Sequence, residues 1–158
     1  MGGATPMTFE EAFDDCYRVA YRAAFRLLGS RGDAEDAAQE AMTRAYVRWR
    51  RIRDYPEAWV ARVAMNLAVD VVRKSKRTAA GDADQGMTDD RREERMDLAN
   101  ALAQLPRRQR DVVALRFLAD RTEDDVARAL GVSVGTVKQH AHRGLKALRT
   151  SLAPTAVA

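Results

Sequence analysis

The sequence predicts an all-α protein made of two small helical domains with a linker between them. Apolar residues recur at helical spacing from residue 9 to residue 77, and no alternating strand pattern of useful length appears. Residues 78–95 are rich in Asp, Glu and Gly and poor in large apolar side chains, so they cannot build a core of their own. We therefore expect domains at 9–77 and 96–152, joined by a flexible acidic linker at 78–95.

The first domain is expected to contain three helices. The first spans about 9–28 and ends at the turn sequence Gly-Ser-Arg-Gly, and the second spans about 33–51. Pro56 begins the third at a position that proline favours, and this helix runs to about residue 76. The large aliphatic residues on one side of the third helix should face the core: Val60, Val63, Leu67 and Val71.

The second domain contains the most informative stretch of the chain, residues 122–149. Thr122 can cap a first short helix with Asp125 three residues later, Gly131 ends that helix, and Ser133 caps the next. The second helix carries cations and no acid: Lys138, Arg143, Lys146 and Arg149. A helix-turn-helix with a basic second helix is typical of binding in the major groove of duplex DNA. The alternative is an ordinary helical hairpin with a solvated basic surface.

Upstream of this motif, the sequence predicts a helix that ends near Gln104, a break at Leu105-Pro106, and a helix over 106–119.

Composition excludes several classes of protein. A net charge of +4 and a pI near 9.6 favour an acidic polymer as partner. No segment is apolar for long enough to span a membrane, and the N-terminus lacks the pattern of a signal peptide, so we expect a cytoplasmic protein that does not bind membranes. The single cysteine, Cys16, shares a helical face with apolar residues and is expected to be a packed thiol.

The second predicted helix carries a polar stripe, with Asp36, Gln39, Glu40 and Thr43 on one face. A neighbouring face of small residues allows close helix packing: Ala37, Ala41 and Ala45. This arrangement favours a surface that docks on helices of another protein. One alternative is a solvated helix start, where the helix macrodipole stabilises acidic side chains. Another is a carboxylate metal site, but neither a histidine nor a second acidic cluster is present to supply the remaining ligands.

The third predicted helix carries a second polar stripe, which consists of Trp59, Arg62, Asn66, Arg73 and the cations at 76–77. With Tyr55 just before the helix, it resembles a site for single-stranded nucleic acid, where aromatic rings stack on bases and cations follow the backbone. The alternative places Trp59 in the core and the cations on an ordinary soluble surface. Spacing alone supports both equally.

Catalysis finds no support in the sequence. The only two histidines, His140 and His142, are two residues apart on a helix and point in different directions, so they cannot share one metal ion. No Ser or Cys motif is paired with a histidine, and no glycine-rich loop follows a strand. We expect a protein that is not an enzyme and that needs neither metal nor cofactor.

Three segments occur in an order that resembles the extracytoplasmic-function (ECF) sigma factors of bacterial RNA polymerase, in the sigma-70 family. They are DAEDAAQEAMTRAY at 33–46, WVARVAMNLAVDVVRKSKR at 59–77 and LPRRQRDVVALRFLADRTEDDVARALGVSVGTVKQHAHRGL at 105–145. They resemble sigma regions 2.2, 2.3–2.4 and 4, and GVSVGTVKQH with the following HRGL is most similar to the actinobacterial SigE-like subfamily. The resemblance implies a region 2 helical bundle and a region 4 helix-turn-helix.

The resemblance also implies roles for single residues. Asp36, Gln39 and Glu40 would dock on the β′ clamp helices of core RNA polymerase. Asn66 would help capture a base flipped from the −10 element, with a pocket shaped by the loop 53–55. The full −10 set is Tyr55, Trp59, Arg62, Asn66 and Arg73, and the −35 set is Thr136, Lys138, Gln139, His142 and Arg143.

The sequence thus predicts a sigma factor that binds core polymerase through the β′ clamp helices and the β flap. Its promoter DNA would be duplex at −35 and single-stranded at −10, and an anti-sigma factor is a further candidate partner. The rival interpretation is a stand-alone helix-turn-helix regulator that dimerises on a palindrome, although one such motif and no evident dimer seam disfavour it. We also expect the two domains to fold independently.

Overall fold

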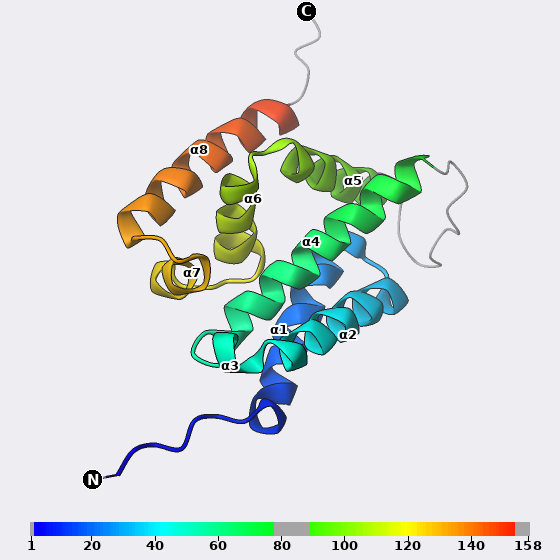
Figure 1. Cartoon of the computed structure of the whole chain (residues 1–158). Coiled ribbons are helices and arrows are strands. Elements are labelled where there is room, and N and C mark those ends of the chain that lie inside the picture. Colours follow the sequence, from blue (N-terminus) through cyan, green and yellow to red (C-terminus); the bar gives the residue numbers. More distant parts are fainter. Residues whose placement is uncertain (1, 78–88, 154–158) are drawn as a thin grey trace, which may run out of the picture.

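The computed structural model describes residues 2–77 and 89–153, and within these ranges every regular element is helical (Figure 1). The predicted all-α class is therefore confirmed. The N-terminal half contains α1 (Phe9–Leu28), α2 (Arg31–Val47), α3 (Trp49–Ile52) and α4 (Pro56–Arg77). The C-terminal half contains α5 (Asp89–Gln104), α6 (Arg107–Val113), the π-helical segment η1 (Ala114–Leu118), α7 (Glu123–Leu130) and α8 (Val134–Leu152).

Helix α1 begins and ends where the sequence predicts. At its start, the Glu11 N–H donates to Oγ1 of Thr8 at 3.2 Å, and the Thr8 N–H donates to Oε2 of Glu11 at 2.8 Å. At its end, Gly29 adopts a φ of +62°, a conformation that a side chain would strain. These two signals fix the span of the helix.

The core of the N-terminal half lies where α1, α2 and α4 meet, and most of its buried residues are alanines. Ala37, Ala41 and Ala45 of α2 are all buried, which confirms the predicted face of small residues. Cys16 is only 1% exposed, so the prediction of a packed thiol is also confirmed.

The predicted core side of α4 is partly wrong. Val60 is fully buried, but Val63 and Leu67 are only partly buried and Val71 is 37% exposed. The helix instead buries a face rich in alanine: Val60, Ala61, Ala64, Met65, Ala68, Val69 and Val72. The reason is that α1 and α2 present alanines of their own, so the close contact selects the small residues of α4.

The predicted helix over 33–51 is divided into α2 and α3, because Arg48 leaves the helical conformation with a φ of −105°. Beyond this break Trp49 lies against α1, with its ring edge-to-face with Phe9 at 5.5 Å. Its indole Nε1 also donates to the carbonyl oxygen of Met7 at 3.0 Å. The break therefore brings an aromatic side chain back onto the bundle.

The C-terminal half begins earlier than predicted. Residues 89–95, assigned to the linker from their composition, belong to α5, while residues 78–88 lie outside the described residues. The predicted helix over 106–119 is also divided, because α6 widens into the π-helical η1. Two residues after η1 ends, Asp120 has a φ of +55°.

The helix-turn-helix is confirmed as α7 and α8. Oγ1 of Thr122 accepts from the Asp125 N–H at 3.1 Å, and Oγ of Ser133 accepts from the Thr136 N–H at 3.1 Å. Gly131 between the helices has a φ of +67°. Further along α8, Gly144 lies so close to α6 that an added Cβ would be 2.5 Å from Cγ2 of Val113.

The two halves pack against each other, an arrangement that the sequence did not predict. In Figure 1, α4 runs between the other helices of its own half and the helices α5 and α6. Helix α4 contacts α5, η1 and α7, and α1 contacts α5, so the buried residues of both halves form one continuous cluster.

Candidate functional site

The polar stripe of α4 lies in the contact between the two halves. Arg62 and Asn66 come together there, both partly buried, and the Arg62 side chain is 23% exposed. Arg73 lies further along the helix and is exposed. Trp59 is partly buried and packs against the core, so its ring has both a packed part and an accessible part.

Opposite Arg62 and Asn66 lies an acid from the other half, Asp111 of α6. Its Oδ1 accepts a hydrogen bond from Nδ2 of Asn66 at 3.4 Å, and its Oδ2 lies 3.3 Å from Nε of Arg62. Asp111 is only 2% exposed, and no other charged residue among those described is as deeply buried. Sequence reasoning missed this residue, although an acid directly before the apolar run Val112–Leu115 is a visible signal.

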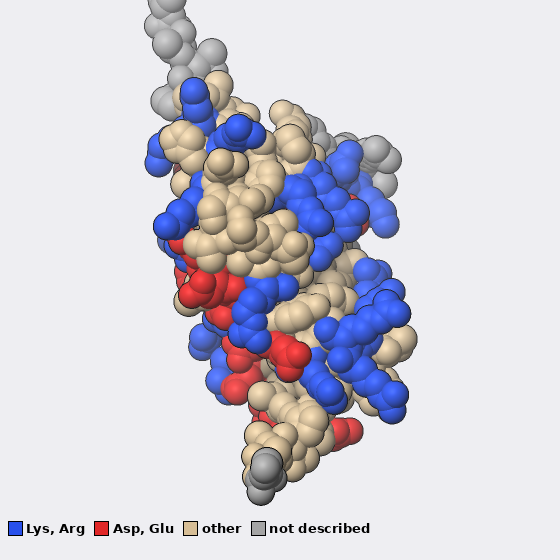
Figure 2. All heavy atoms as spheres, turned by 60° about the vertical axis from the view of Figure 1, so that its left-hand side comes forward, with Lys and Arg blue, Asp and Glu red and all other residues tan. Residues whose placement is uncertain are grey.

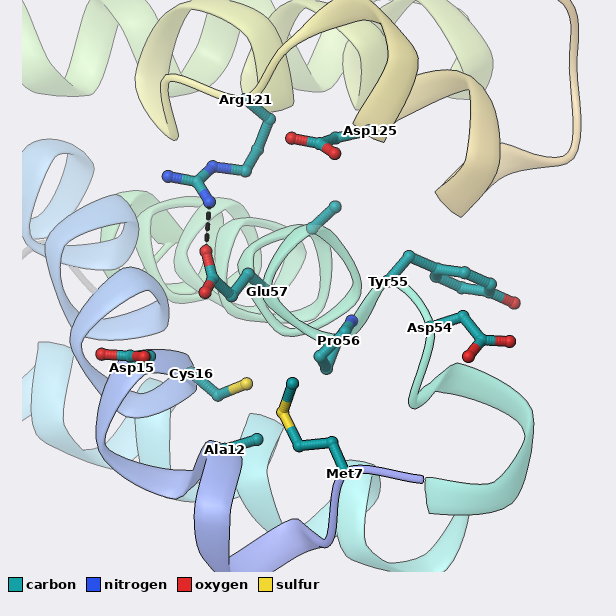
Figure 3. Close-up of a pocket in the computed structure, with 11 residues that line it drawn as sticks. Met7, Ala12, Asp15, Cys16, Asp54, Tyr55, Pro56, Glu57, Arg121 and Asp125 are labelled. Carbon is teal, nitrogen blue, oxygen red and sulfur yellow. Dashed lines mark hydrogen bonds and ion pairs between the residues drawn. The ribbon is translucent and has the colours of Figure 1, made fainter. Parts of the chain in front are cut away.

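The loop before α4 borders a cavity of about 250 Å³ between the halves (Figure 3). Asp54, Tyr55, Pro56 and Glu57 line it from the N-terminal half, and Arg121 and Asp125 line it from the C-terminal half. Arg121 reaches across and pairs with Glu57, as the dashed line in Figure 3 shows. The predicted pocket loop is therefore next to a real cavity, but the helix-turn-helix domain supplies part of its wall.

Cys16 also lines this cavity, with its sulfur near Met7 and Ala12 in Figure 3. Burial raises the pKa of the Cys16 thiol to about 12, and the nearby carboxylates Glu57 and Asp15 add to the shift. The thiol stays protonated at neutral pH, so it is a poor nucleophile and acts as a packed apolar group.

The polar stripe of α2 is on a different surface from that of α4. Asp36, Gln39 and Glu40 are all exposed, and they stand on the helix side opposite its buried alanines. Glu40 pairs with Arg44 of the same helix at 2.9 Å. These residues therefore form a rigidly backed polar surface that is open to a partner.

Helix α8 presents its predicted contact residues at its N-terminal half. Lys138, Gln139, His142 and Arg143 are exposed, and Thr136 is partly buried at the first turn, where its hydroxyl lies 2.9 Å from that of Ser133. Lys138 pairs with Glu123 of α7 at 3.8 Å. Figure 2 shows this side of the molecule, where Lys and Arg side chains form separate groups with Asp and Glu side chains between them.

Two family models match the chain. The model of sigma-70 region 2 matches residues 12–78, and that of sigma-70 region 4 matches residues 95–148. These spans correspond to the N-terminal and C-terminal halves. The helices that carry the α2 and α4 stripes fall in the first model, and the helix-turn-helix falls in the second.

Curated relatives match nearly the whole chain. The ECF RNA polymerase sigma factor SigW of Bacillus subtilis is 31% identical over 90% of this chain and 90% of its own length. The RNA polymerase sigma-E factor of Streptomyces coelicolor is 34% identical over 92% of this chain and 86% of its own length. The chain therefore belongs to the ECF sigma factors of the sigma-70 family, and it is a sigma factor that directs RNA polymerase to promoters and initiates transcription.

Solved structures share the fold at low sequence identity. CnrH, solved in complex with the cytosolic domain of CnrY, has a TM-score of 0.59 and 22% identity, covering 91% of this chain and 86% of that one. The sigma factor RpoE of Bartonella quintana, solved in complex with the anti-sigma factor NepR, has a TM-score of 0.54 and 21% identity, covering 91% of this chain and 96% of that one. The two-domain helical architecture is thus a known one.

Within the described parts of the chain, no helix combines the length and the apolar composition needed to cross a bilayer.

Proposed function

We propose that the three polar surfaces divide the work of promoter recognition and opening. The α2 surface of Asp36, Gln39 and Glu40 binds the β′ clamp helices of core polymerase. The α4 stripe of Tyr55, Trp59, Arg62, Asn66 and Arg73 binds the opened −10 strand. The first turns of α8, with Thr136, Lys138, Gln139, His142 and Arg143, read the −35 duplex in the major groove.

The observation that carries the proposal is that the three polar surfaces lie on three different helices, α2, α4 and α8. The α2 surface is exposed and backed by buried alanines, so it can dock without disturbing the fold. The exposed side of α8 carries cations and amide groups on a helix that Ser133 caps. Exposed helix faces of this kind contact a partner without large backbone changes.

The α4 stripe has the chemistry for an unpaired strand. Nδ2 of Asn66 and Nε of Arg62 both already engage an acidic acceptor, Asp111. Their geometry therefore suits an acceptor atom of a base or phosphate, and the partly exposed ring of Trp59 suits stacking. Unstacking a base costs a few kcal/mol, and such contacts can offset it without catalysis. On this account the protein acts by binding alone, in the cytoplasm, with no metal or cofactor.

A test of the −10 assignment is Asn66→Ala assembled with core polymerase. The variant should bind core normally but open the promoter less, seen as lower permanganate reactivity of the −10 thymines. Lys74→Ala, an exposed position on the same helix outside the proposed set, is the matched control. Unchanged reactivity in Asn66→Ala would remove Asn66 from this role.

A test of the α2 surface is the double variant Asp36→Lys, Glu40→Lys. Each hydrogen-bonded charge lost from an interface can cost about 2–5 kcal/mol, so affinity for core polymerase should fall by orders of magnitude. Reversal of two acids elsewhere on the N-terminal half, Glu10→Lys with Asp14→Lys, controls for net charge, because both acids are exposed on α1. If the α2 variant titrates core as tightly as the parent, docking uses another surface.

The same surfaces suit regulation by an anti-sigma factor, since a sigma factor of this fold, RpoE of Bartonella quintana, was solved with such a partner. The rival interpretation, a stand-alone helix-turn-helix regulator, predicts that the free chain binds duplex DNA strongly. One small recognition surface and mainly phosphate contacts should instead give weak duplex binding that falls steeply with salt. Nanomolar, sequence-specific binding without core polymerase at physiological salt would favour the rival.

A further inference from the structure

We propose that the free chain is self-inhibited: its C-terminal half covers the strand-binding stripe of α4, and Asp111 takes the place of the DNA acceptor on Arg62 and Asn66. This inference rests on the proposed −10 role of α4. The closed state itself, however, can be measured without DNA.

Asp111 is the centre of the closed state. Both partners of its carboxylate, Arg62 and Asn66, belong to the other half of the molecule, at 3.3 and 3.4 Å. A carboxylate that is 2% exposed is unfavourable unless it is paired, and here the pairing exists only when the halves are docked. On separation the acid and the cation both return to water, so this interface can open without exposing a purely apolar surface.

Further polar contacts between the two halves hold the same orientation. Arg26 of α1 pairs with Asp120 at 2.9 Å and also donates to the carbonyl oxygen of Leu118. Arg128 of α7 donates to the carbonyl oxygen of Asp54 at 2.9 Å, and Arg121 pairs with Glu57. Each such pair is weak alone, because it is partly exposed, but together they fix the register of the halves.

Closure and strand binding exclude each other. Nδ2 of Asn66 and Nε of Arg62 face Asp111, and α6 with η1 stands where a strand along α4 would lie. The pocket loop is covered as well, because Arg121 and Asp125 form one wall of its cavity (Figure 3). The apparent affinity for a −10 strand is then reduced by the fraction of molecules that are open. Core polymerase would remove this inhibition by holding the halves apart.

The test uses the full chain with dyes at two exposed positions, Thr43→Cys on α2 and Thr150→Cys on α8. Cys16 is replaced by Ala in every variant, because it lines the cavity between the halves and opening would expose its thiol to the dyes. Single-molecule energy transfer reports the distance between the halves, and fluorescence anisotropy reports binding of a single-stranded −10 oligonucleotide. Asp111→Asn removes the charge and keeps the shape. Asp124→Asn, an exposed acid of α7 with no described partner, is the matched control.

We expect Asp111→Asn to populate a low-transfer state and to tighten strand binding about five- to tenfold, with no change for Asp124→Asn. Arg26→Ala removes a different contact between the halves, the pair with Asp120, and it lies outside the α4 stripe. It should also lower the energy transfer and tighten strand binding. This second variant covers the case in which Asp111→Asn fails to fold.

Unchanged energy transfer in both variants would overturn the closed state. Opening without any gain in strand affinity would overturn the masking of α4. A different result would overturn the proposed −10 function. If Asn66→Ala leaves promoter opening by the assembled polymerase unchanged, that function is wrong, whatever the energy transfer of the free chain shows.

Discussion

The two halves of the molecule bury different kinds of side chain. Where α1, α2 and α4 meet, the N-terminal half buries mainly alanines: Ala12, Ala20, Ala23, Ala24, Ala34, Ala37, Ala38, Ala41, Ala45, Ala61, Ala64 and Ala68. The C-terminal half buries mainly large aliphatic residues: Leu102, Leu105, Val112, Val113, Leu115, Val126, Leu130, Val137 and Leu148. One half is thus held by closely approaching backbones and the other by interlocking side chains.

This difference implies opposite sensitivities to substitution. A contact between alanines leaves no room for added atoms, whereas a contact between leucines and valines leaves a cavity when atoms are removed. The difference suits two tasks. In the N-terminal half, α2 and α4 support polar surfaces, while in the C-terminal half the short helices α6 and α7 need bulky side chains to hold them in place.

The largest effect is expected for Leu115→Ala in η1. Leu115 is fully buried, so the lost contacts and the cavity should lower the free energy of unfolding by about 2–5 kcal/mol. Urea denaturation followed by circular dichroism measures it. Leu152→Ala, at a residue that is 42% exposed, should change the free energy by less than about 0.5 kcal/mol. Equal effects at the two positions would contradict the packing described for the C-terminal half.

A smaller effect is expected for Ala38→Leu in α2, the opposite kind of change. Ala38 is fully buried, and the added atoms should cost about 1–3 kcal/mol by forcing the helices apart. Gln39→Leu, at the exposed neighbouring position, is the control for the same chemical change without burial. If Ala38→Leu is tolerated as well as Gln39→Leu, the alanine contact is looser than the structure indicates.

Gly144→Ala tests a close approach of two helices, α8 and α6, in the C-terminal half. The new Cβ would lie 2.5 Å from Cγ2 of Val113, so we expect a loss of about 1–3 kcal/mol despite the better helix propensity of alanine. In Gly135→Ala the nearest atom is 3.8 Å away, and this variant should gain up to about 1 kcal/mol. A gain for both glycines would show that α8 can move away from α6.

The smallest effect concerns the pH dependence that Cys16 adds to the N-terminal half. Burial raises its pKa from 9.0 to about 12, so above about pH 9 the unfolded chain loses this proton while the folded chain keeps it. Stability should therefore fall with rising pH, by at most about 1.4 kcal/mol for each pH unit. Denaturation of the parent and of Cys16→Ala at about pH 8 and pH 10 isolates this contribution. Parallel losses in both proteins would contradict it.

Much of the fold follows from local signals in the sequence. The span of α1, the start of α4 at Pro56 and the turn at Gly131 all depend on caps and backbone conformation, which neighbouring residues determine. The core side of α4 could not be predicted in the same way, because it depends on what α1 and α2 present to it. Helical spacing placed Val71 on the core side, yet the buried face is the neighbouring one that is rich in alanine.

The candidate site shows the same limit. The polar stripes could be predicted, since helical spacing groups their residues, and Arg62 and Asn66 do lie together. The apolar run after Asp111 marks this acid as unusual, but its pairing with Arg62 and Asn66 could not be predicted. Asp111 is distant in sequence and meets them only through the docking of the two halves. The π-helical turn at η1 likewise carries no signal in a sequence pattern that fits a regular helix.

The positions of the two tryptophans allow their fluorescence to follow the unfolding of one half of the molecule. Both of them, Trp49 and Trp59, belong to the N-terminal half, and Trp59 lies on the helix that the C-terminal half contacts. Intrinsic emission therefore follows one half, while far-ultraviolet ellipticity follows the helices of both. If docking couples the halves, the two signals will trace a single denaturation curve, and a variant that releases the halves will separate them into two.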